Sequence, residues 1–176
     1  YYEDCFSRLV EERYDKIENI YGIQHALADL NNDGDKELLL IIRTFASGYL
    51  FAFHEEDGQL YAWDIYKDFY YNRMGEVDLL ENGMLEFHGG YGVGHYYVQY
   101  DSKGHWEEVL TFYYTDYDKE YDYRLETHQN GELQTVIEYT CDYKGNYIKG
   151  SQKEFDLCKQ ILDEYNQIAR VRRFYS

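Results

Sequence analysis

The feature of this chain that most constrains its fold is a turn pattern that recurs along it. Short segments with Asp, Asn or Gly separate runs of aromatic and β-branched residues, at 55–59, 81–83, 101–104, 129–131 and 142–145. Such a turn between two such runs is the strongest short-range signal for a β-hairpin. The pattern predicts a long antiparallel meander of about eight to ten short strands over residues 48–149, curled into one sheet.

Helical patterns flank the predicted strands. Residues 2–20 carry apolar side chains at helical spacing, which predicts an amphipathic helix. Ser151 and Glu154 match a capping box, and the helical pattern after them leads to Arg170, at a helix end that favours cations. We expect a single α+β domain over residues 1–176, made of helix 2–20, a hairpin at 24–43, the meander 48–149 and helix 152–170.

Charge and hydropathy exclude several classes of partner. The 34 acidic and 17 basic residues give a net charge of −17, whereas nucleic-acid binding needs a basic surface to release counterions. No apolar run approaches the roughly 18 residues of a membrane span, so no transmembrane segment is expected. Three cysteines are too few for a disulfide framework or a zinc cluster, and we expect them to be small buried apolar residues.

The sharpest chemical signal is an acidic loop between two apolar runs, at 29–37. Calcium takes six to eight hard oxygen ligands on a tightly curled loop. The spacing offers side-chain oxygens, one backbone carbonyl and a further carboxylate, which makes the candidate calcium ligands Asp29, Asn31, Asp33, Asp35 and Glu37.

The loop does not match an EF-hand. That motif needs Glu at position 12, where this chain has Leu40, and it needs flanking helices where this chain has strand-like runs. Four carboxylates within nine residues repel one another without a cation, which favours a metal ion. The alternative is an Asx-turn that holds its shape without an ion.

The loop resembles the D-x-[DN]-x-D-G-x-x-[DE]-L loops of FG-GAP and VCBS-type repeats, in which calcium sits in a strand–loop–strand. Most of the chain resembles uncharacterised secreted proteins and lipoproteins of Firmicutes that carry one such loop after an N-terminal helix. The Gly- and Tyr-rich segment 89–97 and the strand-to-helix segment 147–155 match their later parts. The resemblance implies an exported cell-surface protein, extracellular or lipid-anchored through a segment upstream of residue 1.

Aromatic residues suggest a ligand surface. The run at 61–71 forms a candidate stacking platform for sugars or cell-wall polymers, together with Tyr113, Tyr114, Tyr117, Tyr121 and Tyr123. Packing of these rings between strands is the alternative. The candidate ligand-binding residues are Trp63, Tyr66, Tyr70, Tyr91 and His95.

No catalytic residue is assigned from the sequence. His88 and His95 flank a glycine run and could face each other across a hairpin, but histidines satisfied by ordinary contacts are the simpler account. The sequence favours a non-catalytic, exported domain with one structural calcium ion that acts in binding or assembly. The alternatives are a carbohydrate- or cell-wall-binding module, which an exposed aromatic face would favour, and a hydrolase with dispersed acidic residues, which converging His and carboxylate groups would favour.

Overall fold

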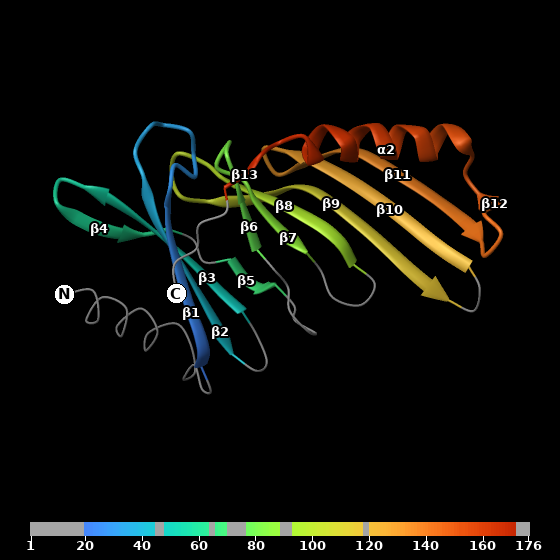
Figure 1. Cartoon of the computed structure of the whole chain (residues 1–176). Helices are drawn as coiled ribbons and strands as arrows, with labels where there is room; N and C mark the ends of the chain where they lie inside the picture. The colour runs from blue at the N-terminus through green and yellow to red at the C-terminus, as the bar shows by residue number, and fades with distance from the viewer. Residues whose placement is uncertain are drawn as a thin grey trace.

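The computed structural model describes residues 20–44, 48–63, 66–69, 77–88, 93–117 and 120–171. These residues form thirteen β-strands and one α-helix, and the strands make two antiparallel sheets (Figure 1). The predicted α+β class is therefore wrong, because the described part of the chain is mainly β. The predicted helix 2–20 lies outside the described residues, except that Ile20 begins a strand.

The first sheet has the order β1–β2–β3–β4. β4 and β5 both pair with β3, β4 along residues 53–56 and β5 along residues 48–50. The strands are β1 (Ile20–Ala28), β2 (Glu37–Thr44), β3 (Gly48–Glu56), β4 (Gln59–Ala62) and β5 (Tyr66–Phe69). β1, the acidic loop and β2 form the strand–loop–strand hairpin that the sequence predicts at 24–43.

The second sheet has the order β12–β11–β10–β9–β8–β7–β6–β13. Each strand from β6 to β11 pairs with the next along the chain, and the last strand, β13, returns to pair with β6. The strands are β6 (Val77–Leu80), β7 (Leu85–His88), β8 (Val93–Tyr100), β9 (Trp106–Tyr117), β10 (Glu120–Gln129), β11 (Glu132–Asp142), β12 (Tyr147–Lys149) and β13 (Arg170–Val171).

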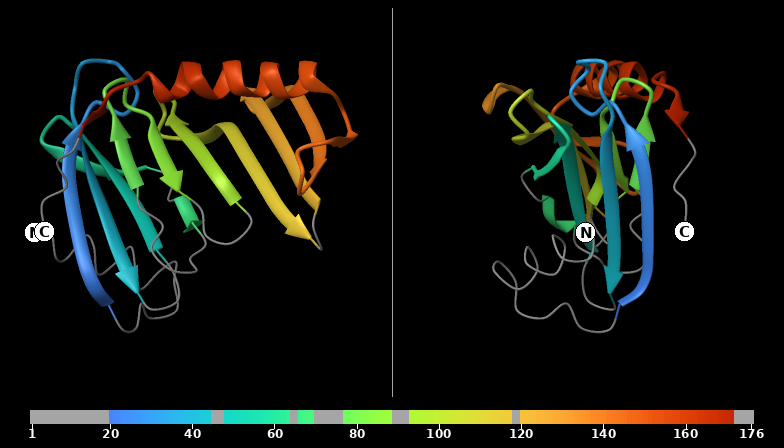
Figure 2. Two further views of the ribbon diagram at one scale, coloured as in Figure 1. Left: turned by 45° about the vertical axis from the view of Figure 1, so that its right-hand side comes forward. Right: turned by 90° about the vertical axis from the view of Figure 1, so that its left-hand side faces the viewer.

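The helix α2 (Gln152–Asn166) begins where the capping box predicts, with Ser151 accepting a hydrogen bond from the Lys153 N–H at 3.3 Å. It crosses the strands of the second sheet (Figure 2). The helix ends at Asn166 and not at the predicted 170, because the following residues join the sheet: the Glu81 N–H donates to the Ala169 carbonyl at 2.9 Å, and Arg170 lies in β13.

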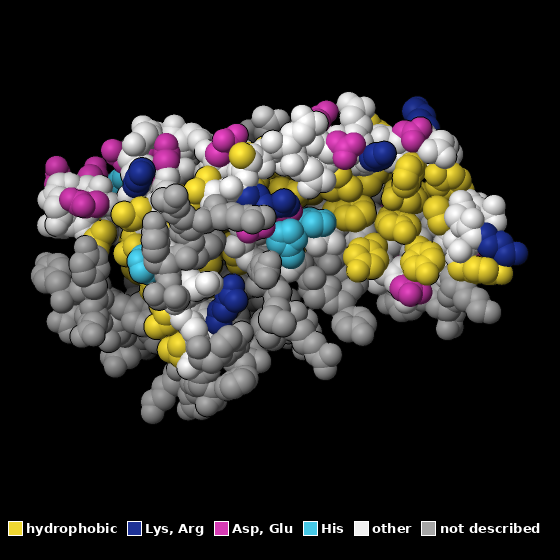
Figure 3. All heavy atoms as spheres, in the orientation of Figure 1, with side chains coloured by type: hydrophobic (Ala, Val, Ile, Leu, Met, Phe, Trp, Pro, Cys, Tyr) yellow, Lys and Arg dark blue, Asp and Glu magenta, His cyan; other side chains and the backbone are white. Residues whose placement is uncertain are grey.

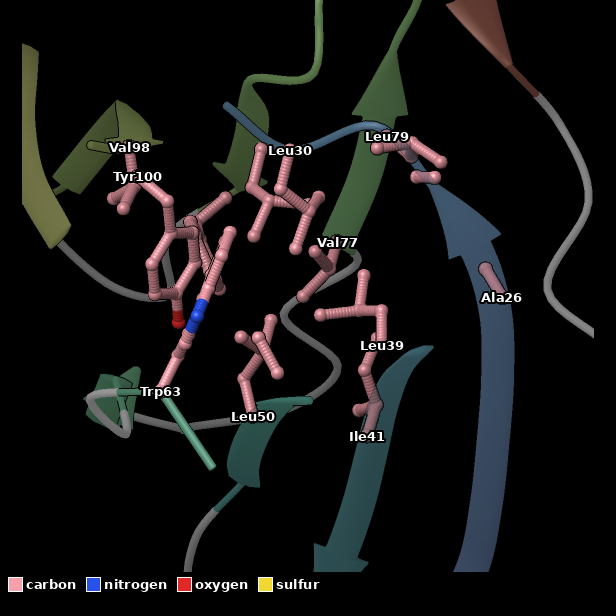
Figure 4. Packing of buried hydrophobic residues seen from close by; sticks show 14 residues of the cluster. Ala26, Leu30, Leu39, Ile41, Leu50, Trp63, Val77, Leu79, Val98 and Tyr100 are labelled. Atoms are coloured by element: carbon pink, nitrogen blue, oxygen red, sulfur yellow. The ribbon is translucent and has the colours of Figure 1, made fainter. Parts of the chain in front are cut away.

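The core between the two sheets explains why the predicted single curled sheet is wrong. Leu39, Ile41 and Leu50 from the first sheet share one buried cluster with Val77 and other residues of the second (Figure 4). A single sheet would leave this apolar face in water, whereas two stacked sheets bury it on both sides.

A second cluster lies on the opposite face of the second sheet, because neighbouring strand residues such as Leu79 and Leu80 belong to different clusters. α2 covers this face, with Cys158 as its buried residue. Burial raises the pKa of the Cys158 thiol to about 11. Sheet, sheet and helix thus form three layers, and the helix-covered face of the middle layer also carries the site described next.

Candidate metal centre

The candidate site is built on β7 and β8. Glu86 is paired with Tyr97, and His88 is paired with His95, in the register of these two strands. Side chains of directly opposed residues project from the same face of an antiparallel pair, and residues two apart on a strand share that face. The carboxylate, the phenol and both imidazoles are therefore brought together on the face that α2 covers further along the sheet.

Three donor groups converge there. Glu86 Oε1 lies 3.0 Å from His95 Nδ1 and 3.7 Å from His88 Nε2, and the two imidazole rings meet edge to face with centroids 5.0 Å apart. One ligand atom from each of the three residues lies within 4.8 Å of the others. Among the described residues, no other set of three or more His, Cys, Asp or Glu side chains converges in this way.

Arg170 of β13 supplies the positive charge that balances the Glu86 carboxylate. The Arg170 guanidinium donates from Nε and Nη2 to Glu86 Oε2, at 2.9 and 2.7 Å. Arg170 Nε also lies 3.1 Å from Asp78 Oδ2, and this oxygen is 3.3 Å from His88 Nε2. The pairing of Arg170 with Leu80 of β6 carries the guanidinium to this position.

The buried carboxylate is held ionised. Only 1% of Glu86 is exposed, and burial alone would raise its pKa. Hydrogen bonds from His95 and Arg170, the nearby His88 and the Tyr97 hydroxyl outweigh burial and lower the pKa of Glu86 to about 2. Burial and the neighbouring Glu86 charge raise the pKa of Tyr97, so its hydroxyl stays a donor to Glu86 Oε1 at 3.0 Å.

The site is open on one side. The side chains of His88 and His95 are 32% and 35% exposed, while that of Glu86 is 1% exposed. The space-filling view shows histidine side chains beside basic and acidic ones near the middle of one face, below α2 (Figure 3). An ion held by the three donors would rest on a buried carboxylate and still be reachable from outside.

The donor set fits a transition metal. Zinc binds imidazole nitrogen and carboxylate oxygen at about 2.0–2.2 Å, so tetrahedral ligand atoms lie roughly 3.3–3.5 Å apart. The two distances from Glu86 Oε1, 3.0 and 3.7 Å, lie on either side of that value. Arg170 and Tyr97 would serve as the outer contacts that orient a ligating carboxylate.

The sequence revealed this site only in part. The facing of His88 and His95 across β7 and β8 is confirmed, but Glu86 was missed. Its signal is the alternation Glu86-Phe-His88, which places the two polar side chains on one face of a strand. No local signal brings in Arg170, which was expected at the end of a helix.

The acidic loop is organised by its own backbone. The Asp29 carboxylate accepts hydrogen bonds from the N–H groups of Asp33 and Gly34, at 3.1 and 3.0 Å. Asp33 accepts from the Asp35 N–H at 2.8 Å and from the Asn31 amide at 2.7 Å, and these contacts lower the pKa of Asp33. The loop thus has the hydrogen bonds of an Asx-turn, and calcium binding by Asp29, Asn31, Asp33, Asp35 and Glu37 stays a prediction.

Glu37 differs from the other predicted ligands because it is fully buried. Its Oε2 accepts the Leu30 N–H at 2.8 Å, and its Oε1 lies 2.9 Å from His54 Nδ1. The hydrogen bond to Glu37 raises the pKa of His54. One oxygen of Glu37 thus contacts the loop backbone and the other contacts His54 of β3, so the carboxylate links the acidic loop to β3.

The predicted aromatic ligand residues separate into different environments. Trp63 is 8% exposed and lies in the core between the rings of His54 and Tyr100, 5.5 Å from each. Tyr66 lies in β5, but its side chain is not among those described. Tyr70 and Tyr91 lie outside the described residues. His95 belongs to the candidate metal centre.

The chain matches no family model, no curated protein and no solved structure. None of the helical structure in the described ranges has the length and apolar character needed to cross a membrane.

Proposed function

We propose that this protein binds one divalent transition-metal ion through Glu86 Oε1, His88 Nε2 and His95 Nδ1. The observation that carries the proposal is the convergence of these three donors on two adjacent strands. Arg170 holds the other oxygen of Glu86 through two hydrogen bonds. Imidazole and carboxylate donors suit zinc and its neighbours in the first transition row better than calcium or magnesium.

Three protein ligands leave a coordination position open. Structural zinc sites use four protein ligands, whereas catalytic ones use three and keep the fourth position for water or substrate. A metal ion lowers the pKa of a bound water and polarises a bound carbonyl or phosphoryl group. Converging histidine and carboxylate groups favour a hydrolytic role over a purely structural one, and the partly exposed face of the site gives an external ligand access.

Metal binding here must compete with protons. The Glu86 carboxylate is ionised throughout the physiological range because its pKa is lowered to about 2. The two imidazoles bind metal only when neutral, so a proton and the metal ion compete for the same nitrogen. Metal affinity is therefore expected to be lower in acid than at neutral pH.

Isothermal titration of the chelator-treated protein with zinc, with calcium in excess to occupy hard-oxygen sites, tests the proposal. We expect one zinc ion per chain in the wild type and none at this site in His88→Ala/His95→Ala. His25→Ala, an exposed histidine on β1, is the matched control and should keep the wild-type isotherm. An unchanged isotherm in the folded double variant would overturn the proposal.

Two expectations from the sequence belong to the same proposal. The positive φ angles of Asn32 and Gly34, 61° and 98°, curl the acidic loop tightly, which supports a structural calcium ion there in addition to the transition metal. An exported, cell-surface location rests on the resemblance of the loop and its flanks to secreted proteins. Cell fractionation with an antibody against the chain tests the location, and recovery from the cytoplasm alone would contradict it.

A further inference from the structure

A separate hollow lies at the end of the second sheet where its turns meet α2. Its volume is about 780 Å³, within the roughly 300–1,000 Å³ range of small-molecule sites. The acidic loop contributes Asn31, the turn after β8 contributes Asp101, the turn after β10 contributes Asn130, and α2 contributes Glu164 and Tyr165. No residue of the metal centre lines it.

The polar lining is dominated by amides. Five of the described lining residues are Asn or Gln: Asn31, Gln99, Gln129, Asn130 and Gln134. A side-chain amide presents two donors and an acceptor in one fixed fork, so it can bind neighbouring hydroxyl groups that each donate and accept. Within the described part of the chain, the side-chain amides of Gln99, Gln129 and Asn130 have no hydrogen-bond partner.

Two carboxylates are held in place by the backbone. Glu107 Oε2 accepts the Gly131 N–H at 2.8 Å, and Asp101 Oδ1 accepts the N–H groups of Lys103 and His105 at 2.8 and 2.9 Å. Each carboxylate therefore has one oxygen anchored and a second that is available as a preoriented acceptor. Preorganised polar groups lose little conformational entropy when a ligand binds.

The charge and the apolar part of the lining narrow the ligand class. No Lys or Arg is among the described residues that line the hollow, whereas Asp101, Glu107 and Glu164 are. This charge balance disfavours phosphates and other anions. Apolar surface comes from Met84, Val109, Ile161 and the Tyr165 ring, which suits a ligand with C–H faces as well as hydroxyl edges.

We propose that this hollow binds a short neutral carbohydrate. The side-chain amides and the two anchored carboxylates would form hydrogen bonds with its hydroxyl groups, and the Tyr165 ring would pack against its apolar C–H face. The site is independent of the metal centre and of the aromatic residues that the sequence singled out. It adds a ligand-binding function to the proposed metal function.

Protein-observed NMR with cello-, chito-, xylo- and malto-tetraose, each added in the presence of EDTA, tests the inference without the metal site. We expect at least one glycan to shift the resonances of Val109 and Tyr165 in a saturable way. The double variant Asn130→Ala/Gln129→Ala should bind that glycan with an affinity lower by about tenfold or more, because it loses hydrogen bonds to the glycan. Gln59→Ala, an exposed amide on β4, should bind as the wild type does.

Three outcomes would overturn the inference. The first is that none of the four glycans shifts these resonances. The second is that the double variant, with an unchanged circular dichroism spectrum, binds as tightly as the wild type. The third is that spermidine, a cationic probe for the acidic lining, saturates the hollow while the glycans do not.

Discussion

The Arg170 guanidinium contacts Glu86 Oε2 through both Nε and Nη2, at 2.9 and 2.7 Å, across 84 residues of sequence. This contact joins β13 to β7 and leaves Oε1 as the oxygen that faces His88 and His95. After the hydrogen bond from His95, it is the next largest cause that lowers the pKa of Glu86 and keeps this nearly fully buried carboxylate ionised. The short strand β13 is therefore part of the metal centre and not only the end of the sheet.

Removing this guanidinium should weaken both the fold and the site. Arg170→Ala leaves Glu86 without its two charge-assisted hydrogen bonds, and we expect a loss of about 2 kcal/mol in the free energy of unfolding. Zinc affinity should fall about 10- to 100-fold, as for other contacts that orient a metal ligand. Urea unfolding and zinc titration measure the two effects.

Arg124→Ala is the matched control for Arg170→Ala. Arg124 also bridges two carboxylates, those of Glu126 and Glu138, but on an exposed face of the sheet. Exposed ion pairs contribute little to folding stability. The free energy of unfolding and the zinc affinity should therefore change far less in Arg124→Ala than in Arg170→Ala. Equal effects in the two variants would contradict the assignment of Arg170 to the site.

The ionisation of Glu86 predicts acid sensitivity. Its folded pKa of about 2 lies below its ordinary value of 4.5, so the unfolded chain binds more protons than the folded chain between these values. The stabilisation from Glu86 is present above pH 4.5 and is lost as the pH falls toward 2. Urea midpoints measured from pH 5 to pH 2 should fall less steeply in Glu86→Gln than in the wild type.

Glu132→Gln, an exposed carboxyl at the start of β11, serves as the control for this pH series. It should keep the wild-type slope. If Glu86→Gln also kept the wild-type slope, Glu86 would not be held ionised in the fold.

Calcium should stabilise the acidic loop. We expect calcium to raise the melting temperature of the wild type and Asp33→Ala to abolish the rise, because Asp33 lies at the centre of the loop's hydrogen bonds. Asp116→Ala, which removes an exposed carboxylate on β9, should respond to calcium as the wild type does. Identical melting curves in calcium and in chelator would rule out the calcium ion.

The packing between the sheets can be tested at Gly104. A Cβ at Gly104 would lie 2.3 Å from the Trp63 ring, which is buried in the core between the sheets, whereas a Cβ at Gly145 would meet nothing within 4 Å. Both glycines have left-handed backbones, with φ angles of 80° and 82°, so the two Ala variants carry similar backbone strain. Gly104→Ala should be less stable than Gly145→Ala by about 1–3 kcal/mol in urea unfolding. Equal stabilities would contradict the close packing of Trp63 on this turn.

Local features of this fold were predictable and long-range ones were not. Asn130–Gly131 and Ser151 mark a hairpin turn and a helix start through short-range chemistry, and both occur where expected. The division into two sheets depends on which apolar faces meet, and several stackings satisfy the same alternation of side chains. A prediction from strand patterns alone could not choose among them.

The metal centre shows the same limit. His88 and His95 are neighbours across one hairpin, so their meeting follows from local register. Asp78 joins them through the pairing of β6 with β7, and Arg170 through the pairing of β13 with β6. The two strands whose pairing places Arg170 at the site are separated by about half of the chain. Nothing in the residues around Arg170 distinguishes it from a cation at the end of a helix.

The most direct test of the account is X-ray absorption at the zinc edge on protein loaded with one zinc ion per chain. We predict a first shell of two imidazole nitrogens and carboxylate or water oxygen at about 2.0–2.2 Å. The imidazole scattering should be absent from His88→Ala/His95→Ala. A spectrum with only oxygen neighbours in the wild type would contradict the metal centre at Glu86, His88 and His95.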